Sequence, residues 1–151
     1  MERANSRLRR LRHPPRGDLS RLRRALTMRV LLDTHVLLWW LAGERLSKEA
    51  IEVIGDPTNE VCVSAATVWE LSIKRQLGKV EMPDGLAEQC SDEGFRILVI
   101  DGRHAELAGS LPLHHTDPFD RMLIAQAQLD TLIIVTRDRA FAAYGVQVLA
   151  A

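Results

Sequence analysis

The chain has 151 residues, of which 46% are hydrophobic and 26% are charged, and its formal net charge is zero. This composition is typical of one globular domain and argues against a disordered chain. The longest apolar run is much shorter than the roughly 20 residues that a membrane-spanning helix needs, so we expect a soluble protein.

The zero net charge conceals a strongly basic start. Residues 1–27 contain nine Arg and two acids, so they carry +7, whereas residues 28–151 carry −7. This leader has few large apolar residues and a double-proline break, and we expect it to be mostly disordered. We favour its interpretation as translated upstream sequence with the true start at Met28; a basic arm that binds nucleic acid and a transit peptide are the alternatives.

The two cysteines, Cys62 and Cys90, lie far apart and form no CxxC pair. Neither a zinc ribbon nor a disulfide framework is therefore predicted. Cys62 lies in an apolar run, where a buried thiol behaves as a small hydrophobic residue. Reduced thiols favour a cytoplasmic location.

Short apolar runs rich in β-formers alternate with helical segments along the chain. In chain order, the expected elements are a strand at 29–32, a helix at 34–42, a helix to residue 54 capped by Ser47, a strand at 61–63, a helix at 65–77 capped by Ser64, a helix starting at Pro83, a strand at 96–100, a helix at 102–110, a helix at 118–129, a strand at 132–135, helical turns at 138–143 and a strand at 146–149. This alternation predicts a three-layer α/β/α domain over residues 28–151 with a mostly parallel central sheet of about five strands.

Two helices carry features that matter for a site. For the helix after Ser64, the hydrophobic pattern predicts an inward stripe with Glu70 at its margin. The members of that stripe are Ala66, Trp69, Ile73 and Leu77. Asp117 followed by Pro118 is a typical helix start, and the helix that it begins places Asp120 in its first turn.

Four acids fall where parallel sheets bind ligands. Asp33 directly follows the first strand, and Asp138 follows the fourth strand by two residues. Glu70 and Asp120 lie on the helices next to those strands, so we expect all four to converge at the carboxyl edge of the sheet. Singly, each acid also has a structural explanation: helix caps for Asp33 and Asp138, a capping-box acid for Asp120 and a solvated helix residue for Glu70.

Convergent carboxylates need a cation. A pair about 4 Å apart costs about 4 kcal/mol at an effective dielectric constant of about 20. Oxygen ligands select hard divalent ions such as Mg²⁺ or Mn²⁺. Such an ion lowers the pKa of a bound water and neutralises charge on a leaving oxygen, which predicts phosphodiester cleavage without a protein nucleophile.

Four stretches carry a resemblance to a known family. In order, LLDTHVLLWWL, SAATVWELSIKRQLGK, DPFDRMLIAQAQ and VTRD resemble the signature stretches of PIN-domain ribonucleases, specifically the VapC-type toxins of toxin–antitoxin systems, and the match covers essentially residues 28–151. By this resemblance the catalytic and metal-binding acids are Asp33, Glu70, Asp120 and Asp138, and the small hydroxyl positions that support them are Thr34, Ser64 and Thr136.

The resemblance implies a Mg²⁺- or Mn²⁺-dependent endoribonuclease that acts on structured or ribosomal RNA. It also implies a cognate antitoxin, whose tail occupies the cleft and inhibits the enzyme, and a homodimer. Such proteins usually begin a residue or two before the first strand, so the leader departs from the family pattern.

Several neighbouring residues have two interpretations. His35, His114 and His115 show no metal-binding spacing, so solvated histidines are favoured over metal ligands. Asp117 is expected to cap its helix, with a supporting role at the site as the alternative. Arg121 is considered for contact with a phosphate or an antitoxin carboxylate, and an ordinary surface salt bridge is the alternative.

Rival functions fit the sequence less well. A receiver domain expects its acid after the central strand, and a phosphatase with an Asp nucleophile expects DxD, which Asp33-Thr34-His35 lacks. A catalytically weak module that binds antitoxin, operator DNA or RNA stays open, because a domain of charge −7 repels RNA at long range. Affinity for RNA would then come from a metal, from a partner or from the local cations Lys74, Arg75, Lys79 and Arg121.

Overall fold

The computed structural model describes residues 27–151, so the expectations for the basic leader lie outside the described residues. In chain order, the elements are β1 (Arg29–Leu32), α2 (Thr34–Leu41), α3 (Lys48–Gly55), β2 (Glu60–Ser64), α4 (Ala65–Gln76), α5 (Leu86–Asp92), β3 (Arg96–Leu98), α6 (Gly102–Ser110), α7 (Pro118–Asp130), β4 (Ile133–Thr136), the 3-10 helix η1 (Arg139–Tyr144) and β5 (Val148–Ala150). Each expected strand and helix is present, with boundaries shifted by a few residues.

The five strands form one sheet in the order β3-β2-β1-β4-β5, and every neighbouring pair is parallel. The chain builds one half of the sheet outward from β1 to β3 and then crosses over to place β4 on the other side of β1. Strand order therefore reverses between β1 and β4, and in parallel sheets ligands bind at the carboxyl ends of the strands at such a point.

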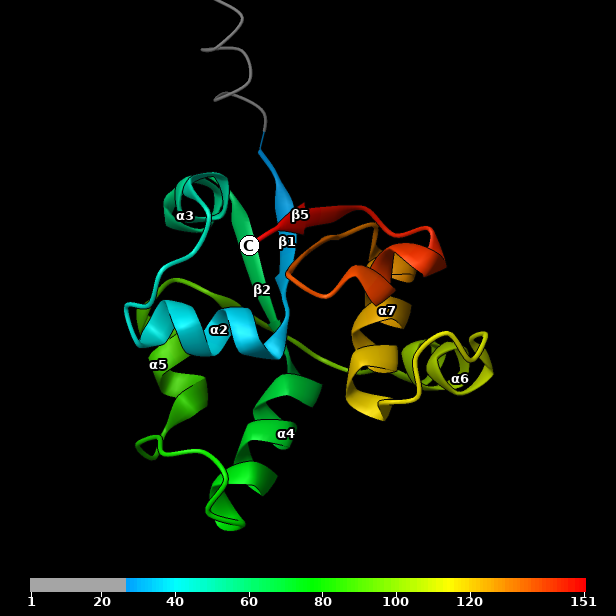
Figure 1. Ribbon diagram of the computed structural model, residues 1–151, viewed down its shortest axis with the longest axis horizontal. Helices are drawn as coiled ribbons and strands as arrows, with labels where there is room; N and C mark the ends of the chain where they lie inside the picture. Colours follow the sequence, from blue (N-terminus) through cyan, green and yellow to red (C-terminus); the bar gives the residue numbers. More distant parts are fainter. Residues whose placement is uncertain (1–26) are drawn as a thin grey trace, which may run out of the picture.

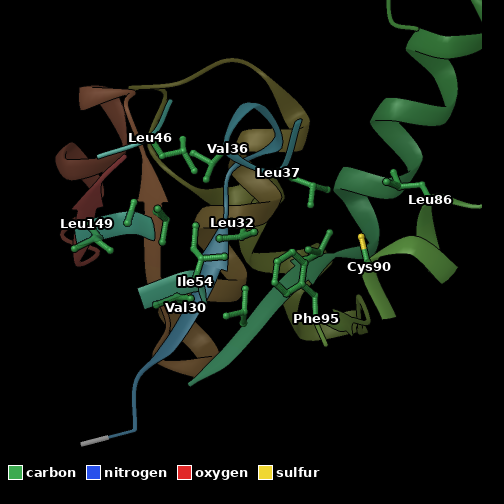
Figure 2. Close-up of a cluster of buried hydrophobic side chains, with 14 of the residues drawn as sticks. Val30, Leu32, Val36, Leu37, Leu46, Ile54, Leu86, Cys90, Phe95 and Leu149 are labelled. Atoms are coloured by element: carbon green, nitrogen blue, oxygen red, sulfur yellow. The ribbon is translucent and has the colours of Figure 1, made fainter. Parts of the chain in front are cut away.

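Helices cover both faces of the sheet, which confirms the predicted three-layer α/β/α fold (Figure 1). On one face, the side chains of α2, α3 and α5 pack with those of β1 in a continuous apolar cluster, in which Figure 2 shows Leu32, Val36, Ile54 and Cys90. On the other face, α6, α7 and η1 pack against the sheet through a second cluster that includes Ile124 and Phe141. Strands buried on both faces explain the uninterrupted apolar runs of the sequence.

The inward face of α4 differs from the prediction. Its buried residues are Ala66, Thr67, Glu70 and Leu71. Trp69 is 63% exposed and Leu77 is 62% exposed, so the expected apolar stripe is wrong. In Figure 1, α4 extends past the ends of the strands. Its buried face is therefore mixed: Leu71 packs in the apolar cluster, whereas Thr67 and Glu70 are polar. Trp69 instead packs edge-on against Phe119 of α7, at 5.3 Å between ring centroids.

Two smaller differences have local causes. The helix expected from Pro83 begins at Leu86, because Gly85 adopts a left-handed conformation (φ 81°) at its N-cap. The third strand ends at Leu98 rather than residue 100.

Among residues 27–151, no helix combines the length and hydropathy needed to cross a membrane.

Both cysteines are buried as free thiols. Burial is the main cause that raises the pKa of Cys62 and the pKa of Cys90 to about 11. Cys62 therefore behaves as the small buried residue that its sequence context predicts.

Candidate active site

Asp33 lies at the point where β1 ends and α2 begins, and its side chain is 5% exposed. It occupies the N-cap position of α2 without forming a side-chain cap hydrogen bond, so the capping explanation is wrong. Instead, the Thr136 hydroxyl at the end of β4 donates a hydrogen bond to its Oδ2 (2.8 Å). The charge is thus placed at the β1–β4 switch point and is fixed by the neighbouring strand.

Glu70 reaches the same region from α4 and is also 5% exposed, which excludes the solvated alternative. Its Oε1 lies 3.4 Å from Nζ of Lys74, one helical turn further on. Its Oε2 is buried and has no hydrogen-bond partner among the described residues. A buried carboxylate oxygen without a partner is costly, and a cation is the group that offsets this cost.

Asp120 lies in the first turn of α7, where Asp117 does the capping: Oδ1 of Asp117 accepts the backbone N–H groups of Phe119 (2.8 Å) and Asp120 (3.2 Å). The pKa of Asp120 is raised to about 7, mainly by burial and also by the negative charges of Asp33, Asp117 and Glu70, whereas His115 acts to lower it. The charges of Asp33 and Glu70 both act on Asp120, which supports the predicted convergence of these three acids.

Asp138 is held by hydrogen bonds to neighbouring residues. Its Oδ1 accepts the backbone N–H of Ala140 (2.9 Å), so the expected helix cap of η1 is present. Its Oδ2 accepts a hydrogen bond from Nε2 of His115 (3.2 Å), and its backbone N–H donates to the Thr136 hydroxyl (2.9 Å). Thr136 thus links Asp138 to Asp33, and His115 links it to Asp120.

His115 is the residue that sequence reasoning missed. Its Nε2 lies 3.0 Å from Oδ2 of Asp120 and 3.2 Å from Oδ2 of Asp138, and its side chain is 17% exposed, so the expectation of a solvated histidine is wrong for it. The three residues offer ligand atoms within 4.8 Å of one another. A usable signal was its place two residues before the Asp117 cap, which brings the ring to the start of α7. His35 and His114 are exposed, as expected.

The other predicted residues play structural parts. Ser64 is buried and caps α4 through the backbone N–H of Ala66 (3.0 Å). Thr34 is buried, and its hydroxyl lies 3.4 Å from that of Thr67 on α4, which joins the two helices that carry acids.

Arg121 does not lie where a phosphate or an antitoxin could reach it. It is 8% exposed, and its guanidinium donates hydrogen bonds to five backbone carbonyls of the segment before α7, so both the expected ligand contact and the surface salt bridge are corrected. Of the other cations that sequence analysis considered, Arg75 pairs with Asp84 and Lys74 pairs with Glu70.

The donor set fits a hard divalent cation. Asp33 follows β1, Glu70 lies on α4 and Asp120 lies in the first turn of α7, and each offers carboxylate oxygens. Oxygen donors of this kind suit Mg²⁺ or Mn²⁺. Among the described residues, Oε2 of Glu70 has no hydrogen-bond partner, and burial beside other acids raises the pKa of Asp120. Both features fit a site that a cation would stabilise.

Comparison with known protein families gives a match to the PIN domain over residues 30–147. This chain belongs to the PIN-domain family. It is 32% identical over 114 residues to the ribonuclease VapC22 of Mycobacterium tuberculosis, spanning 73% of this chain and 87% of that protein. The resemblance to VapC-type PIN domains predicted from the four signature stretches is therefore confirmed.

Solved structures share this PIN-domain fold. A chain of a toxin–antitoxin complex from Klebsiella pneumoniae is similar with a TM-score of 0.58 and 25% identity, over 80% of this chain and 96% of that chain. A chain of DNA-bound VapBC from Salmonella typhimurium gives a TM-score of 0.56 at 18% identity, over 82% and 98%. At 18% identity, the similarity to the Salmonella typhimurium chain shows a shared fold alone.

Proposed function

We propose that this chain is a divalent-metal-dependent endoribonuclease, the toxin of a toxin–antitoxin pair, and that a cognate antitoxin inhibits it. The observation that carries this proposal is that two acids, Asp33 and Glu70, are buried and that their charges act on a third, Asp120, whose pKa is raised to about 7. The names of similar proteins support the substrate and the partner: one is a ribonuclease, and another belongs to a toxin–antitoxin complex.

The proposed roles follow from the geometry. Asp33, Glu70 and Asp120 would hold the cation, and Asp138 is the fourth acid of the set. Thr136 orients Asp33 through its 2.8 Å hydrogen bond, and Asp117 leaves Asp120 free by capping α7 in its place. A bound Mg²⁺ or Mn²⁺ supplies an activated water and neutralises charge on the phosphate and on the leaving oxygen.

Binding of RNA needs positive charge near these acids, because the domain itself carries −7. On and directly after α4, Lys74, Arg75 and Lys79 are the cations nearest in sequence to Glu70, and we assign them to the RNA backbone. We further propose that the protein acts in the cytoplasm as a homodimer. Its buried, reduced cysteines suit that compartment.

The experiment compares RNA cleavage by the chelator-treated chain with and without added Mg²⁺ or Mn²⁺, using a structured RNA. We expect metal-dependent cleavage by the parent and a loss of roughly 100-fold or more in Asp33→Asn and Asp120→Asn, each with an unchanged circular dichroism spectrum. Glu60→Gln, an acid at the opposite ends of the strands, is the matched control and should cut normally.

Two results would overturn the proposal. If Asp33→Asn and Asp120→Asn cut as well as the parent, the catalytic assignment is wrong. If the parent binds RNA or antitoxin but never cuts, the chain is the catalytically weak binding module that its sequence also allows.

A further inference from the structure

The segment before α7 is built to hold one side chain in place. The buried guanidinium of Arg121 donates to the carbonyls of Leu111 (2.8 Å), Pro112 (3.0 Å) and His115 (3.2 Å). From the other side, the Tyr144 hydroxyl donates to the Pro112 carbonyl (2.7 Å) and accepts the backbone N–H of His115 (2.6 Å). A buried cation and a buried phenol thus fix the backbone on both sides of His115.

The ring of His115 is oriented as firmly as its backbone. Its Nδ1 accepts the backbone N–H of Asp117 (3.3 Å), and its edge packs on the ring of Phe141 at 5.8 Å between centroids. Because Nδ1 is an acceptor, Nε2 of the neutral ring carries the proton. That Nε2–H lies within reach of two acceptors, Oδ2 of Asp120 at 3.0 Å and Oδ2 of Asp138 at 3.2 Å, so the two carboxylates share it.

These contacts divide the four acids into two kinds. Both oxygens of Asp138 accept hydrogen bonds, one from Ala140 and one from His115. In Asp33 and Asp120 the contacts involve Oδ2, and in Glu70 the oxygen Oε2 has no partner. Asp138 is therefore engaged in holding His115, whereas the other three acids retain an oxygen for a ligand.

We propose that His115 is a positioning residue: supported by Asp138, it holds the Asp120 carboxylate in the orientation that binds the divalent cation. This inference rests on the proposed function and assigns the arrangement of its site. Carboxylates that bind a metal are commonly held by hydrogen bonds from neighbouring groups, and removal of such a group weakens metal affinity by about 10–100-fold. His115 is not assigned as a ligand, because the nitrogen that faces the acids carries the proton.

The test measures Mn²⁺ affinity of the full chain by electron paramagnetic resonance. We expect His115→Leu, which keeps bulk against Phe141 but cannot donate, to weaken Mn²⁺ binding by roughly 10–100-fold. His115→Gln, whose amide can donate an N–H group, should recover most of the affinity. His114→Leu, at the exposed neighbouring position, is the matched control and should bind as the parent does.

Two further measurements separate positioning from other roles. Because His115 and Asp138 act as one unit, Asp138→Asn should cost about as much as His115→Leu, and the double variant should cost no more than the larger single loss. Pulsed electron paramagnetic resonance of the Mn²⁺-bound parent should show no ¹⁴N coupling from an imidazole ligand.

The inference is overturned by an unchanged Mn²⁺ affinity in His115→Leu, by additive losses in the double variant, or by a ¹⁴N coupling that disappears in His115→Leu. Any of these, with tight Mn²⁺ binding by the parent, leaves the proposed nuclease standing. If the parent binds no Mn²⁺ at all, the metal site of the proposed function fails together with the inference. If His115→Leu does not fold, Asp138→Asn carries the comparison, and an unchanged Mn²⁺ affinity in that variant overturns the inference.

Discussion

Acids at the amino ends and at the carboxyl ends of the strands have different surroundings, and their pKa values shift in opposite directions. At the amino ends, Glu60 pairs with Nε of Arg29 (2.9 Å) and with Nη1 of Arg96 (2.7 Å), and the hydrogen bond from Arg29 is the main cause that lowers the pKa of Glu60. At the carboxyl ends, no ion pair between Asp33 or Asp120 and an arginine is present among the described residues, and burial together with the charge of Asp33 raises the pKa of Asp120 to about 7.

This contrast teaches which acids serve the fold and which serve a ligand. A paired, partly exposed acid such as Glu60 is at low energy in the folded chain alone. Asp120 is partly buried beside other acids, and its pKa is raised; groups perturbed in this way cluster at functional sites. The predictions below test whether the two ends differ in this way.

The largest effect is expected for Glu70→Gln at the carboxyl ends. The variant removes a buried negative charge whose Oε2 has no partner, so we expect roughly 100-fold or greater loss of metal-dependent RNA cleavage. Mn²⁺ should raise the melting temperature of the parent, because a ligand that binds only the folded state stabilises it, and should raise that of Glu70→Gln much less. Calorimetry with and without Mn²⁺ measures both values.

Glu88→Gln, on an exposed face of α5, is the control for this variant and should respond to Mn²⁺ as the parent does. An equal rise in melting temperature for Glu70→Gln and the parent would mean that this carboxylate does not hold the cation.

A second prediction concerns the pH dependence of the metal-free protein. The pKa of Asp120 is raised from 3.8 to about 7 in the folded state, so between these values the folded chain binds a proton that the unfolded chain has lost. Stability in chelator should therefore fall as pH rises from about 4 to about 7, by several degrees in melting temperature. Asp120→Asn should flatten that decline; an identical pH profile in the variant would show that Asp120 carries no unbalanced charge.

The sequence was sufficient for the fold and for placing Asp33 and Asp138 after their strands, since strand ends and helix caps are local features. The metal-binding role of Asp33, Glu70, Asp120 and Asp138 stays a prediction. The sequence was insufficient for His115, whose place depends on hydrogen bonds from Arg121 and Tyr144, residues that the chain brings close only after folding. The inward face of α4 was predicted wrongly for a related reason: hydrophobic periodicity assumes that the inside is apolar, and here the inside is the acidic site.

Tyr144→Phe should lower the Mn²⁺ affinity by a smaller factor than the substitutions at the acids. The variant keeps the ring but removes the hydroxyl that accepts the His115 N–H and donates to the Pro112 carbonyl. Loss of hydrogen bonds worth about 1 kcal/mol should loosen His115, and we expect Mn²⁺ affinity to fall several-fold. Phe141→Leu, which changes packing under the same ring without touching these hydrogen bonds, is the comparison; a fall in affinity for it alone would assign the effect to packing.

Glu60→Gln should have the smallest effect, and at the opposite ends of the strands. Its ion pairs are partly exposed, and such pairs contribute little, so the melting temperature at pH 7 should fall by at most a few degrees. The pKa of Glu60 is lowered in the folded state, so its contribution is present above its usual value of 4.5 and is lost as pH falls below it. Thermal unfolding of both proteins at pH 7 and at pH 3 measures this, and the difference between them should shrink at pH 3. Because Mn²⁺ binds at the other end, it should stabilise Glu60→Gln as much as the parent, and a weaker response would mean that the two ends of the sheet are coupled.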